Sequence, residues 1–224
     1  GHFEKIEKYF PKDHIICGTG MIATRLDGPA NVDFMGPVNS EVMHMPPYNN
    51  KPADKTTEAV FNDFTAAKMG PVMVDEWKGM CMSKVVFNAV TNTLCTMFEM
   101  QMGQFIEYEG VTKMATTLFN EAFDACERAG IHMIESRQEE IDSVIPVSQA
   151  YKYHYPSMYQ AFSKGRPTEV DYINGYIAKI GREHDYVCRV HEFVVQEVHM
   201  AEMMRKYHKP QENVADSKKA QVEA

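Results

Sequence analysis

Residues 80–98 read MCMSKVVFNAVTNTLCTMF, and this stretch decides how the rest of the chain is interpreted. Apolar side chains occur at every angle of its helical projection, namely Met80, Met82, Val85, Val86, Phe87, Ala89, Val90, Leu94, Met97 and Phe98. A helix that is apolar all round is covered by other parts of its protein. The stretch therefore predicts a long central helix, from Glu76 to about Met100, that is buried on nearly all sides.

A narrow polar stripe interrupts this apolar surface. Lys84, Asn88, Thr91 and Asn92 occupy positions i, i+4, i+7 and i+8, which fall close together at about 100° per residue. Burying a lysine is costly unless the ammonium is paired or reaches water. The stripe is compatible with the wall of a polar pocket. It is equally compatible with a snorkelling lysine and two amides that bind neighbouring loops.

Everything after residue 76 has a helical pattern. Further helices are predicted at 110–129, 147–164, 168–184 and 190–207, with Gly130, Gly165 and Gly181 near helix ends. The polar, aperiodic residues 209–224 are expected to form a disordered tail. We therefore expect residues 76–208 to be an all-helical domain.

The first 75 residues have a different pattern. A short helix at 3–10 and a longer one at 54–68 are predicted, the latter with Ala59, Val60, Phe64 and Ala67 on one face. Short β segments are predicted at 14–24, 32–35, 41–45 and 71–75, with a turn at 27–29 and a loop at 46–50. So few strands cannot make a sheet that is covered on both faces. Residues 1–75 are expected to be the C-terminal part of a larger α/β domain.

A dinucleotide-binding fingerprint occurs early but lacks its context. Residues 18–23, Gly-Thr-Gly-Met-Ile-Ala, match G-x-G-x-x-A. The fingerprint needs a helix that opens directly after it, because the helix N-terminus holds the pyrophosphate. Here the turn at residues 27–29 interrupts the segment and no helical period follows. A glycine-containing strand is the better interpretation.

A second polar constellation lies between residues 155 and 176. It contains Ser157-Met158-Tyr159-Gln160 and, after Pro167, Thr168-Glu169-Val170-Asp171-Tyr172-Ile173-Asn174-Gly175. Thr168 with Asp171 three residues later is a variant of the capping box, which predicts that Glu169 lies in a first helical turn. There the helix dipole favours a carboxylate, so Glu169 is either a functional acid or only a partner of the dipole.

Composition excludes several classes of protein. The 224 residues contain 23 Lys and Arg and 31 Asp and Glu, a net charge of −8, and the basic residues are scattered. No basic stripe for nucleic acid, no apolar run of membrane-spanning length and no secretion signal is present. The five cysteines are odd in number, widely spaced and without a C-x-x-C pair, which favours a reduced, cytoplasmic protein.

The two polar constellations together resemble the ketopantoate reductase (2-dehydropantoate 2-reductase) family. That family carries K-x-x-x-N-x-x-x-N after a Trp in its long helix, matched here by Trp77 and by Lys84 to Asn92. It also carries S-M-x-Q followed by T-E-[IV]-D-Y-I-N-G, matched from Ser157 to Gly175. The resemblance extends from residues 1–4, which are similar to the loop and helix after the family's N-G turn, to about Tyr207.

The resemblance implies a fold and an activity. The fold is an NADPH-binding Rossmann domain, of which residues 1–75 would be a remnant, followed by an all-helical substrate and dimerisation domain of the 6-phosphogluconate-dehydrogenase C-terminal-like type. The activity is NADPH-dependent reduction of 2-dehydropantoate to pantoate, in pantothenate and coenzyme A biosynthesis, by a cytoplasmic homodimer. The family's phosphate loop is absent from this chain, so the fragment alone is expected to be inactive.

The resemblance also assigns roles to individual residues. It makes Lys84 the general acid that protonates the keto oxygen, and places Glu169 near that lysine, the substrate and the cofactor. Asn88, Asn92 and Ser157 would hydrogen-bond the substrate. A positioned ammonium suits this chemistry, because reduction builds negative charge on oxygen.

Two departures from the family pattern leave the exact 2-oxoacid open. Thr93 stands where the family often has Pro, and Ala161 stands where it often has Asp. A related enzyme that reduces a different 2-oxoacid would share the rest of the pattern.

Two rival hypotheses belong to other classes. The first is a non-catalytic helical binding or dimerisation module, against which the retention of Lys84, Asn88, Ser157 and Glu169 speaks. The second is a metalloprotein that uses His184, His191 and His199. Their spacing matches no recognised ligand pattern, and we expect no metal.

Overall fold

The computed structural model describes residues 2–20, 24–34, 43–45 and 53–207, and they form two compact units. The first unit comprises residues 1–85 and 126–136, and the second comprises residues 86–125 and 137–224. The long helix α3 (Trp77–Met97) begins in the first unit and continues into the second. Each unit is described by itself.

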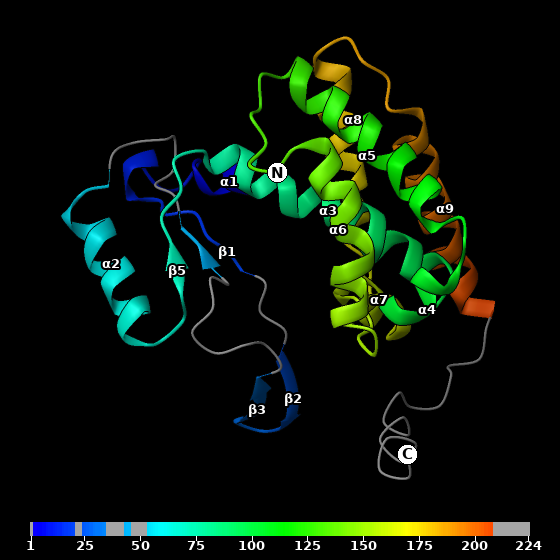
Figure 1. The fold of residues 1–224 in the computed structure, drawn as a ribbon, viewed down its shortest axis with the longest axis horizontal. Helices are drawn as coiled ribbons and strands as arrows, with labels where there is room; N and C mark the ends of the chain where they lie inside the picture. The colour runs from blue at the N-terminus through cyan, green and yellow to red at the C-terminus, as the bar shows by residue number, and fades with distance from the viewer. Residues whose placement is uncertain (1, 21–23, 35–42, 46–52, 208–224) are drawn as a thin grey trace. The chain divides into compact units, whose positions relative to one another are not determined.

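The first unit combines small β-structures with helices (Figure 1). Its elements before α3 are α1 (Phe3–Ile6), η1 (Lys12–His14), β1 (Thr19–Gly20), β2 (Thr24–Gly28), β3 (Asn31–Phe34), β4 (Met43–His44), α2 (Lys55–Ala66) and β5 (Pro71–Val72). One sheet has the strand order β1-β4-β5, with β1 antiparallel and β5 parallel to β4. Strands β2 and β3 form a separate hairpin.

The core of the first unit gathers around the start of α3. Cys17, Trp77 and Met80 are buried together, and the ring of Phe3 meets that of Trp77 edge to face at 5.5 Å between centroids. Gly79 allows a close approach here, since a Cβ atom at this position would overlap the carbonyl oxygen of His132. This contact holds residues 131–133 against the first turn of α3.

Gly79→Ala is therefore expected to lower the free energy of unfolding by about 1–3 kcal/mol, the usual cost of overpacking. The loss would occur although alanine favours a helix over glycine by about 1 kcal/mol. Urea denaturation measures it. Gly28→Ala is the control, because a Cβ atom at Gly28 meets nothing within 4 Å. Equal stability of the two variants would show that the segment at His132 yields easily.

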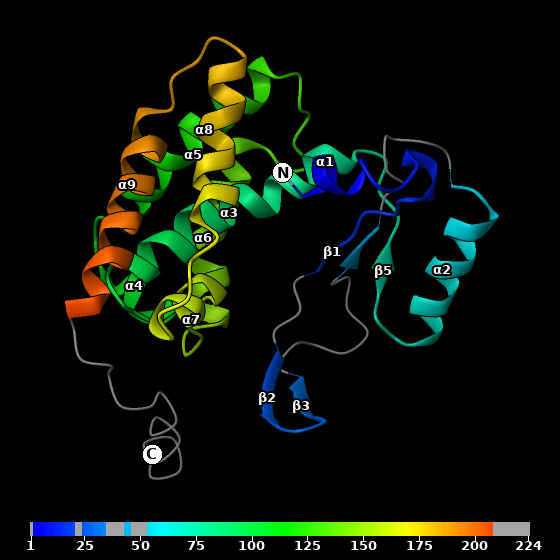
Figure 2. The same ribbon diagram turned by 180° about the vertical axis from the view of Figure 1, so that it is seen from behind.

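The second unit is entirely helical among its described residues. After α3 it contains α4 (Met102–Glu107), α5 (Val111–Arg128), α6 (Arg137–Ala150), α7 (Ser157–Ser163), η3 (Val170–Tyr172), α8 (Asn174–Glu183), α9 (Arg189–Met204) and η4 (Arg205–Tyr207). Helices α8 and α9 lie side by side in both views (Figure 1, Figure 2). The middle of α3 is fully buried at Val86, Ala89 and Val90. The prediction of a mainly helical protein with a buried central helix is confirmed.

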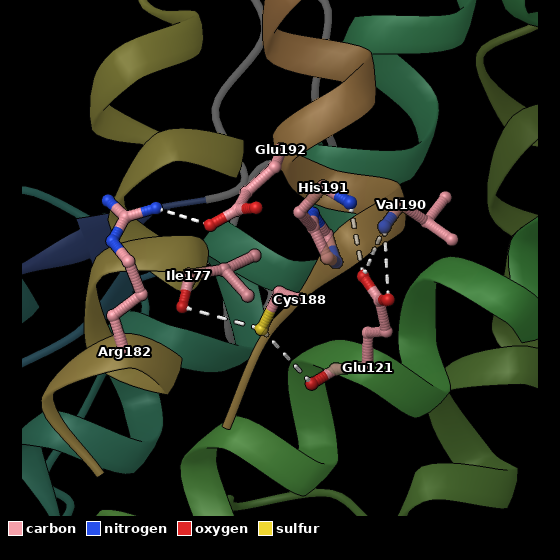
Figure 3. Close-up of polar contacts among 7 residues, drawn as sticks. All are labelled: Glu121, Ile177, Arg182, Cys188, Val190, His191 and Glu192. Carbon is pink, nitrogen blue, oxygen red and sulfur yellow. Dashed lines mark hydrogen bonds and ion pairs between the residues drawn. The ribbon is translucent and has the colours of Figure 1, made fainter. Parts of the chain in front are cut away.

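Carboxylate side chains accept hydrogen bonds from the first amides of α2 and α9. Asp54 accepts a hydrogen bond from the amide of Thr57 at 2.8 Å and starts α2, as an N-cap residue does. At α9 the cap comes from a distant helix. Glu121 of α5 accepts hydrogen bonds from the amides of Val190 and His191, each at 3.0 Å (Figure 3). A carboxylate at this end of α9 also complements the helix dipole.

Two helix predictions in the second unit are wrong. The helix expected at 147–164 is instead the end of α6 and the separate helix α7. Helix α6 begins at Arg137 and continues through Pro146, although proline is disfavoured inside a helix. The helix expected at 168–184 is divided by Ile173, whose backbone is not helical (φ −108°, ψ −89°), into η3 and α8. The short helix α4 was not predicted.

Other expectations differ in detail or cannot be compared. On α2, Ala59 and Ala67 are exposed, and the inward face is formed by Thr57, Val60, Phe61 and Phe64. Residues 21–23, 41–42, the loop at 46–50 and the tail at 209–224 lie outside the described residues. None of the described helices is both long enough and apolar enough to span a bilayer.

Candidate functional site

Lys84 lies on α3 within the first unit and is half-buried. Its ammonium donates a hydrogen bond of 2.6 Å to the backbone carbonyl of Gly20. This carbonyl belongs to β1, so Gly20 of the G-x-G match lies in a strand and orients the lysine. Sequence reasoning found no role for Gly20, because the contact joins residues 64 positions apart in the sequence.

Burial lowers the pKa of Lys84, because removal from water disfavours the charged ammonium. A thiolate at Cys81 would oppose this effect. However, burial also raises the pKa of Cys81 to about 11, so this thiol is neutral at pH 7. Desolvation therefore dominates, and Lys84 gives up its proton more readily than a lysine in water.

Asn88 and Asn92 lie on the part of α3 that belongs to the second unit. The amide of Asn92 donates to the hydroxyl of Ser157, at the start of α7, with 3.5 Å between the two atoms. Asn88 is half-buried, and its side chain has no hydrogen-bond partner among the described residues. The third member of the polar stripe, Thr91, is buried and donates to the carbonyl of Phe87 in its own helix. The structure thus brings Asn92 and Ser157 together, and it removes Thr91 from the candidate site.

Glu169 directly precedes η3 and is exposed. It was expected in the first turn of a long helix, and this is wrong: η3 has three residues, and the side chain of Asp171 contacts His199 instead of completing a capping box. A helix dipole therefore does not explain Glu169. Its carboxylate has no ion-pair or hydrogen-bond partner within the part of the chain that the structure describes.

Sequence reasoning missed the buried residue Asn174, the Asn of the D-Y-I-N-G string. Its side chain accepts a hydrogen bond from the Thr93 hydroxyl at 2.7 Å and donates to the carbonyl of Ala89 at 3.0 Å. It also lies 3.2 Å from Nδ1 of His191. Thr93, one of the two departures from the family pattern, thus has a structural partner. The sequence did offer a signal for Asn174, because this residue belongs to the string of residues 168–175 that also contains Glu169.

The three histidines of the metal hypothesis make separate contacts. His184 lies 2.9 Å from the carbonyl of Ile180, and His191 is fully buried, 3.0 Å from the carbonyl of Leu118. His199 lies between Asp171 and Glu202. Within residues 2–20, 24–34, 43–45 and 53–207, no three His, Cys, Asp or Glu side chains are grouped so that they could hold a metal ion.

The two units carry different polar groups, and each set is described by itself. The first supplies an ammonium with a lowered pKa at Lys84. The second supplies amides at Asn88 and Asn92, a hydroxyl at Ser157 and a carboxylate at Glu169. An ammonium can donate a proton, while amides and hydroxyls can bind the carboxylate and hydroxyl groups of a small organic acid.

Comparisons with known proteins agree on one family. Residues 76–202 match the model of the family described as "Ketopantoate reductase PanE/ApbA C terminal". The 2-dehydropantoate 2-reductase of Lactococcus lactis subsp. lactis (strain IL1403) is 29% identical over 210 residues, which are 92% of this chain and 65% of that protein. The chain thus spans a little under two thirds of the length of this curated relative.

Solved structures have the same fold. The ternary structure of a D-mandelate dehydrogenase with NADH and anilino(oxo)acetate has a TM-score of 0.78 and 26% identity, over 90% of this chain and 64% of that one. A structure described as a putative 2-dehydropantoate 2-reductase from Enterococcus faecalis has a TM-score of 0.64 and 26% identity, over 91% of this chain and 64% of that one. The matched family model covers more than half of the chain, which therefore belongs to the ketopantoate reductase PanE/ApbA C-terminal family.

Proposed function

We propose that the complete protein containing this chain reduces a 2-oxoacid with NADPH, and that the substrate is 2-dehydropantoate, which becomes pantoate in pantothenate and coenzyme A biosynthesis. The observation that carries the proposal is the pair formed by Asn92 and Ser157, which two separate family strings supply and which lie within 3.5 Å. The lowered pKa of Lys84 supports it independently. The 2-dehydropantoate 2-reductases among the relatives support the choice of this substrate.

The proposed chemistry assigns one role to each side chain. Lys84 protonates the keto oxygen of the substrate as negative charge develops there, and regains a proton from water. Its bond to the carbonyl of Gly20 fixes the ammonium without cancelling its charge, because the carbonyl is neutral. Asn88, Asn92 and Ser157 bind the polar groups of the substrate through amide and hydroxyl hydrogen bonds.

NADPH would supply the hydride when bound. The G-x-G match does not fit its phosphate groups, since Gly20 lies in strand β1 and not at the N-terminus of a helix. Only Glu169 is proposed to contact the cofactor from this chain. Its free, exposed carboxylate is suited to a ribose or amide group.

A second candidate substrate follows from the structural neighbours. A D-mandelate dehydrogenase is 26% identical to this chain, close to the 29% of the Lactococcus relative. Its hydroxy acid corresponds to phenylglyoxylate, a 2-oxoacid with an aromatic side chain. The same five site residues would serve either substrate.

Turnover by the complete purified protein decides between these functions. We expect oxidation of NADPH with 2-dehydropantoate to be at least tenfold more efficient in kcat/KM than with phenylglyoxylate, a difference of about 1.4 kcal/mol. The reverse order would make the protein a mandelate-type dehydrogenase. A folded protein that oxidises neither NADPH nor NADH with either acid would be the non-catalytic helical module.

Glu169→Gln is expected to lower kcat/KM by about 10-fold or more and to change the pH–rate profile, because it removes a charge at constant size. The helix content should be unchanged, since the side chain of Glu169 is exposed and makes no capping hydrogen bond to η3. Circular dichroism and steady-state kinetics at several pH values measure both effects. Glu183→Gln is the control, since Glu183 is another exposed carboxylate of the second unit. A wild-type pH profile with a wild-type KM would take Glu169 out of the site.

A cytoplasmic homodimer completes the proposal. All five cysteines are free thiols, as a reducing compartment favours. Exposed apolar side chains recur along α9 and η4 at helical spacing, namely Phe193, Met200, Met204 and Tyr207. Exposed apolar side chains of this kind suit a subunit interface.

A further inference from the structure

The segment that carries Glu169 is tied to α9 at its first residue. The backbone amide of Thr168 donates a hydrogen bond of 2.6 Å to a carboxylate oxygen of Glu202. Burial would raise the pKa of Glu202, but the hydrogen bonds from Thr168 and His199 outweigh it and lower the pKa. Glu202 is therefore ionised at neutral pH and holds Thr168 through a charge-assisted bond.

The same segment is tied a second time, through His199. One ring nitrogen of His199 lies 3.1 Å from the other carboxylate oxygen of Glu202, and the second nitrogen lies 3.0 Å from Asp171. Carboxylates only accept hydrogen bonds, so both contacts are made only when both nitrogens carry a proton. The geometry is that of an imidazolium between two anions.

Val170 fixes the segment between these two ties. Its side chain is fully buried in a cluster with Met158, Val195 and Val198. Thr168, Val170 and Asp171 are thus each held in place, by Glu202, by the core and by His199. Glu169 is the one residue of this run whose side chain has no partner among the described residues.

We propose that His199, Glu202 and Asp171 form a pH-dependent clamp that positions Glu169 for its role in the reductase reaction. The inference rests on the proposed function for the role of Glu169. The clamp itself rests on the contacts among Thr168, Asp171, His199 and Glu202. His199 and Glu202 are positioning residues, because they act on Glu169 through its neighbours in the chain.

The direction of the pH dependence follows from His199. Hydrogen bonds that the His199 ring donates, first to Glu202 and second to Asp171, raise the pKa of this imidazole above its usual value, while burial opposes them. The charged groups that face it are Glu202 on its own helix and Asp171 on η3. A raised folded pKa stabilises the clamp fully below the ordinary histidine pKa, and the stabilisation is lost as pH rises through the folded value.

The two arms of the clamp differ in strength. The side chain of Asp171 is 62% exposed and that of Glu202 is 22% exposed. Solvent and salt screen the exposed arm more strongly. Loss of the proton should therefore release Asp171 first, while Glu202 continues to hold Thr168.

Hydrogen exchange of the complete protein tests the clamp without reference to activity. In the wild type, we expect protection factors of the amides of residues 170–173 to fall about 3- to 10-fold as pH rises through the pKa of His199. In His199→Gln they should be low and independent of pH, because glutamine cannot bridge both carboxylates. His184→Gln is the matched control, since it removes a histidine of the same unit whose ring contacts the carbonyl of Ile180. Protection that is equal in the wild type and in His199→Gln at every pH overturns the clamp.

A double-mutant cycle tests whether the clamp acts through Glu169. His199→Gln alone should lower kcat/KM about 10-fold, as misplacement of a site residue does, and the fall should be smaller in a background that already carries Glu169→Gln. Equal effects in both backgrounds overturn the link to Glu169. A wild-type protein with no 2-oxoacid reductase activity would contradict the proposed function, and the exchange data would then still decide whether the clamp exists.

If His199→Gln does not fold, hydrogen exchange of the wild type at several pH values tests the clamp by itself. The histidine signals of the wild type give the folded pKa of His199 in the same samples. Protection of residues 170–173 that follows this titration supports the clamp. Protection that does not change across it overturns the proposal.

Discussion

Replacement of Lys84 by alanine in the complete protein is expected to lower kcat by about 10²–10⁴, the usual loss when a general acid is removed. The ammonium is half-buried, has a lowered pKa and is held by a neutral carbonyl, so it is both oriented and able to release its proton. KM for the 2-oxoacid should change much less, because amides and a hydroxyl are proposed to bind it. Steady-state kinetics with saturating cofactor measure the two constants separately.

Two further variants identify what the lysine supplies. Lys84→Arg keeps the charge but cannot donate a proton near neutral pH, so it should be nearly as slow as Lys84→Ala. Lys78→Ala removes an exposed lysine of the same helix and should leave kcat near the wild-type value. A kcat near wild type in Lys84→Ala would assign the proton to another group and leave Lys84 as a structural partner of β1.

The wild-type rate should also depend on pH through Lys84. The general acid must be protonated, so kcat falls as pH rises through the pKa of this lysine. Because burial lowers that pKa, the fall should begin at a lower pH than for a lysine in water. The decline should be absent from Lys84→Ala.

The central helix could be predicted because its signal is local. Between Met80 and Met97, apolar side chains occur on all sides of the helix. Such a helix is stable only when other helices cover it, and α3 is buried as expected. The cap at Asp54 and the end of α5 near Gly130 are local signals of the same kind. Such signals need no knowledge of the fold.

Other parts of the fold depend on contacts that the sequence does not display. Helix α6 continues through Pro146, where a local rule predicts a boundary. The segment at Thr168 leaves the helix because Glu202 and His199 of α9 bind it, about 30 residues further along the chain. Tertiary hydrogen bonds here override a local helix pattern.

The candidate site also has one part that the sequence predicted and another part that only the structure shows. The spacing of Lys84, Asn88 and Asn92 predicted a polar stripe, but it also included Thr91, which bonds back to its own helix. Periodicity selects a face and not the environment of each side chain. The pair of Asn92 and Ser157 and the bond from Lys84 to Gly20 required the structure, because each joins residues more than 60 positions apart.

The buried amide of Asn174 joins three helices of the second unit. It accepts from the Thr93 hydroxyl and donates to the carbonyl of Ala89, both on α3, and it lies beside Nδ1 of His191 on α9. Burial lowers the pKa of His191, so its ring is neutral. The ring then donates from Nε2 to the carbonyl of Leu118, 3.0 Å away on α5, and accepts from Asn174 at Nδ1. These bonds hold the part of α3 between Asn88 and Asn92.

Asn174→Ala should therefore lower the free energy of unfolding by about 2–5 kcal/mol. It leaves the Thr93 hydroxyl and His191 Nδ1 buried without partners, at about 1–3 kcal/mol each, and it opens a small cavity. Urea denaturation at pH 7 measures the loss, and Asn120→Ala, which removes a half-buried amide 3.3 Å from Arg137, should cost far less. Adding Thr93→Val to Asn174→Ala should recover part of the stability, because it removes one of the two orphaned groups. Losses that simply add would mean that the Thr93 hydroxyl finds another partner, and that the network does not act as a unit.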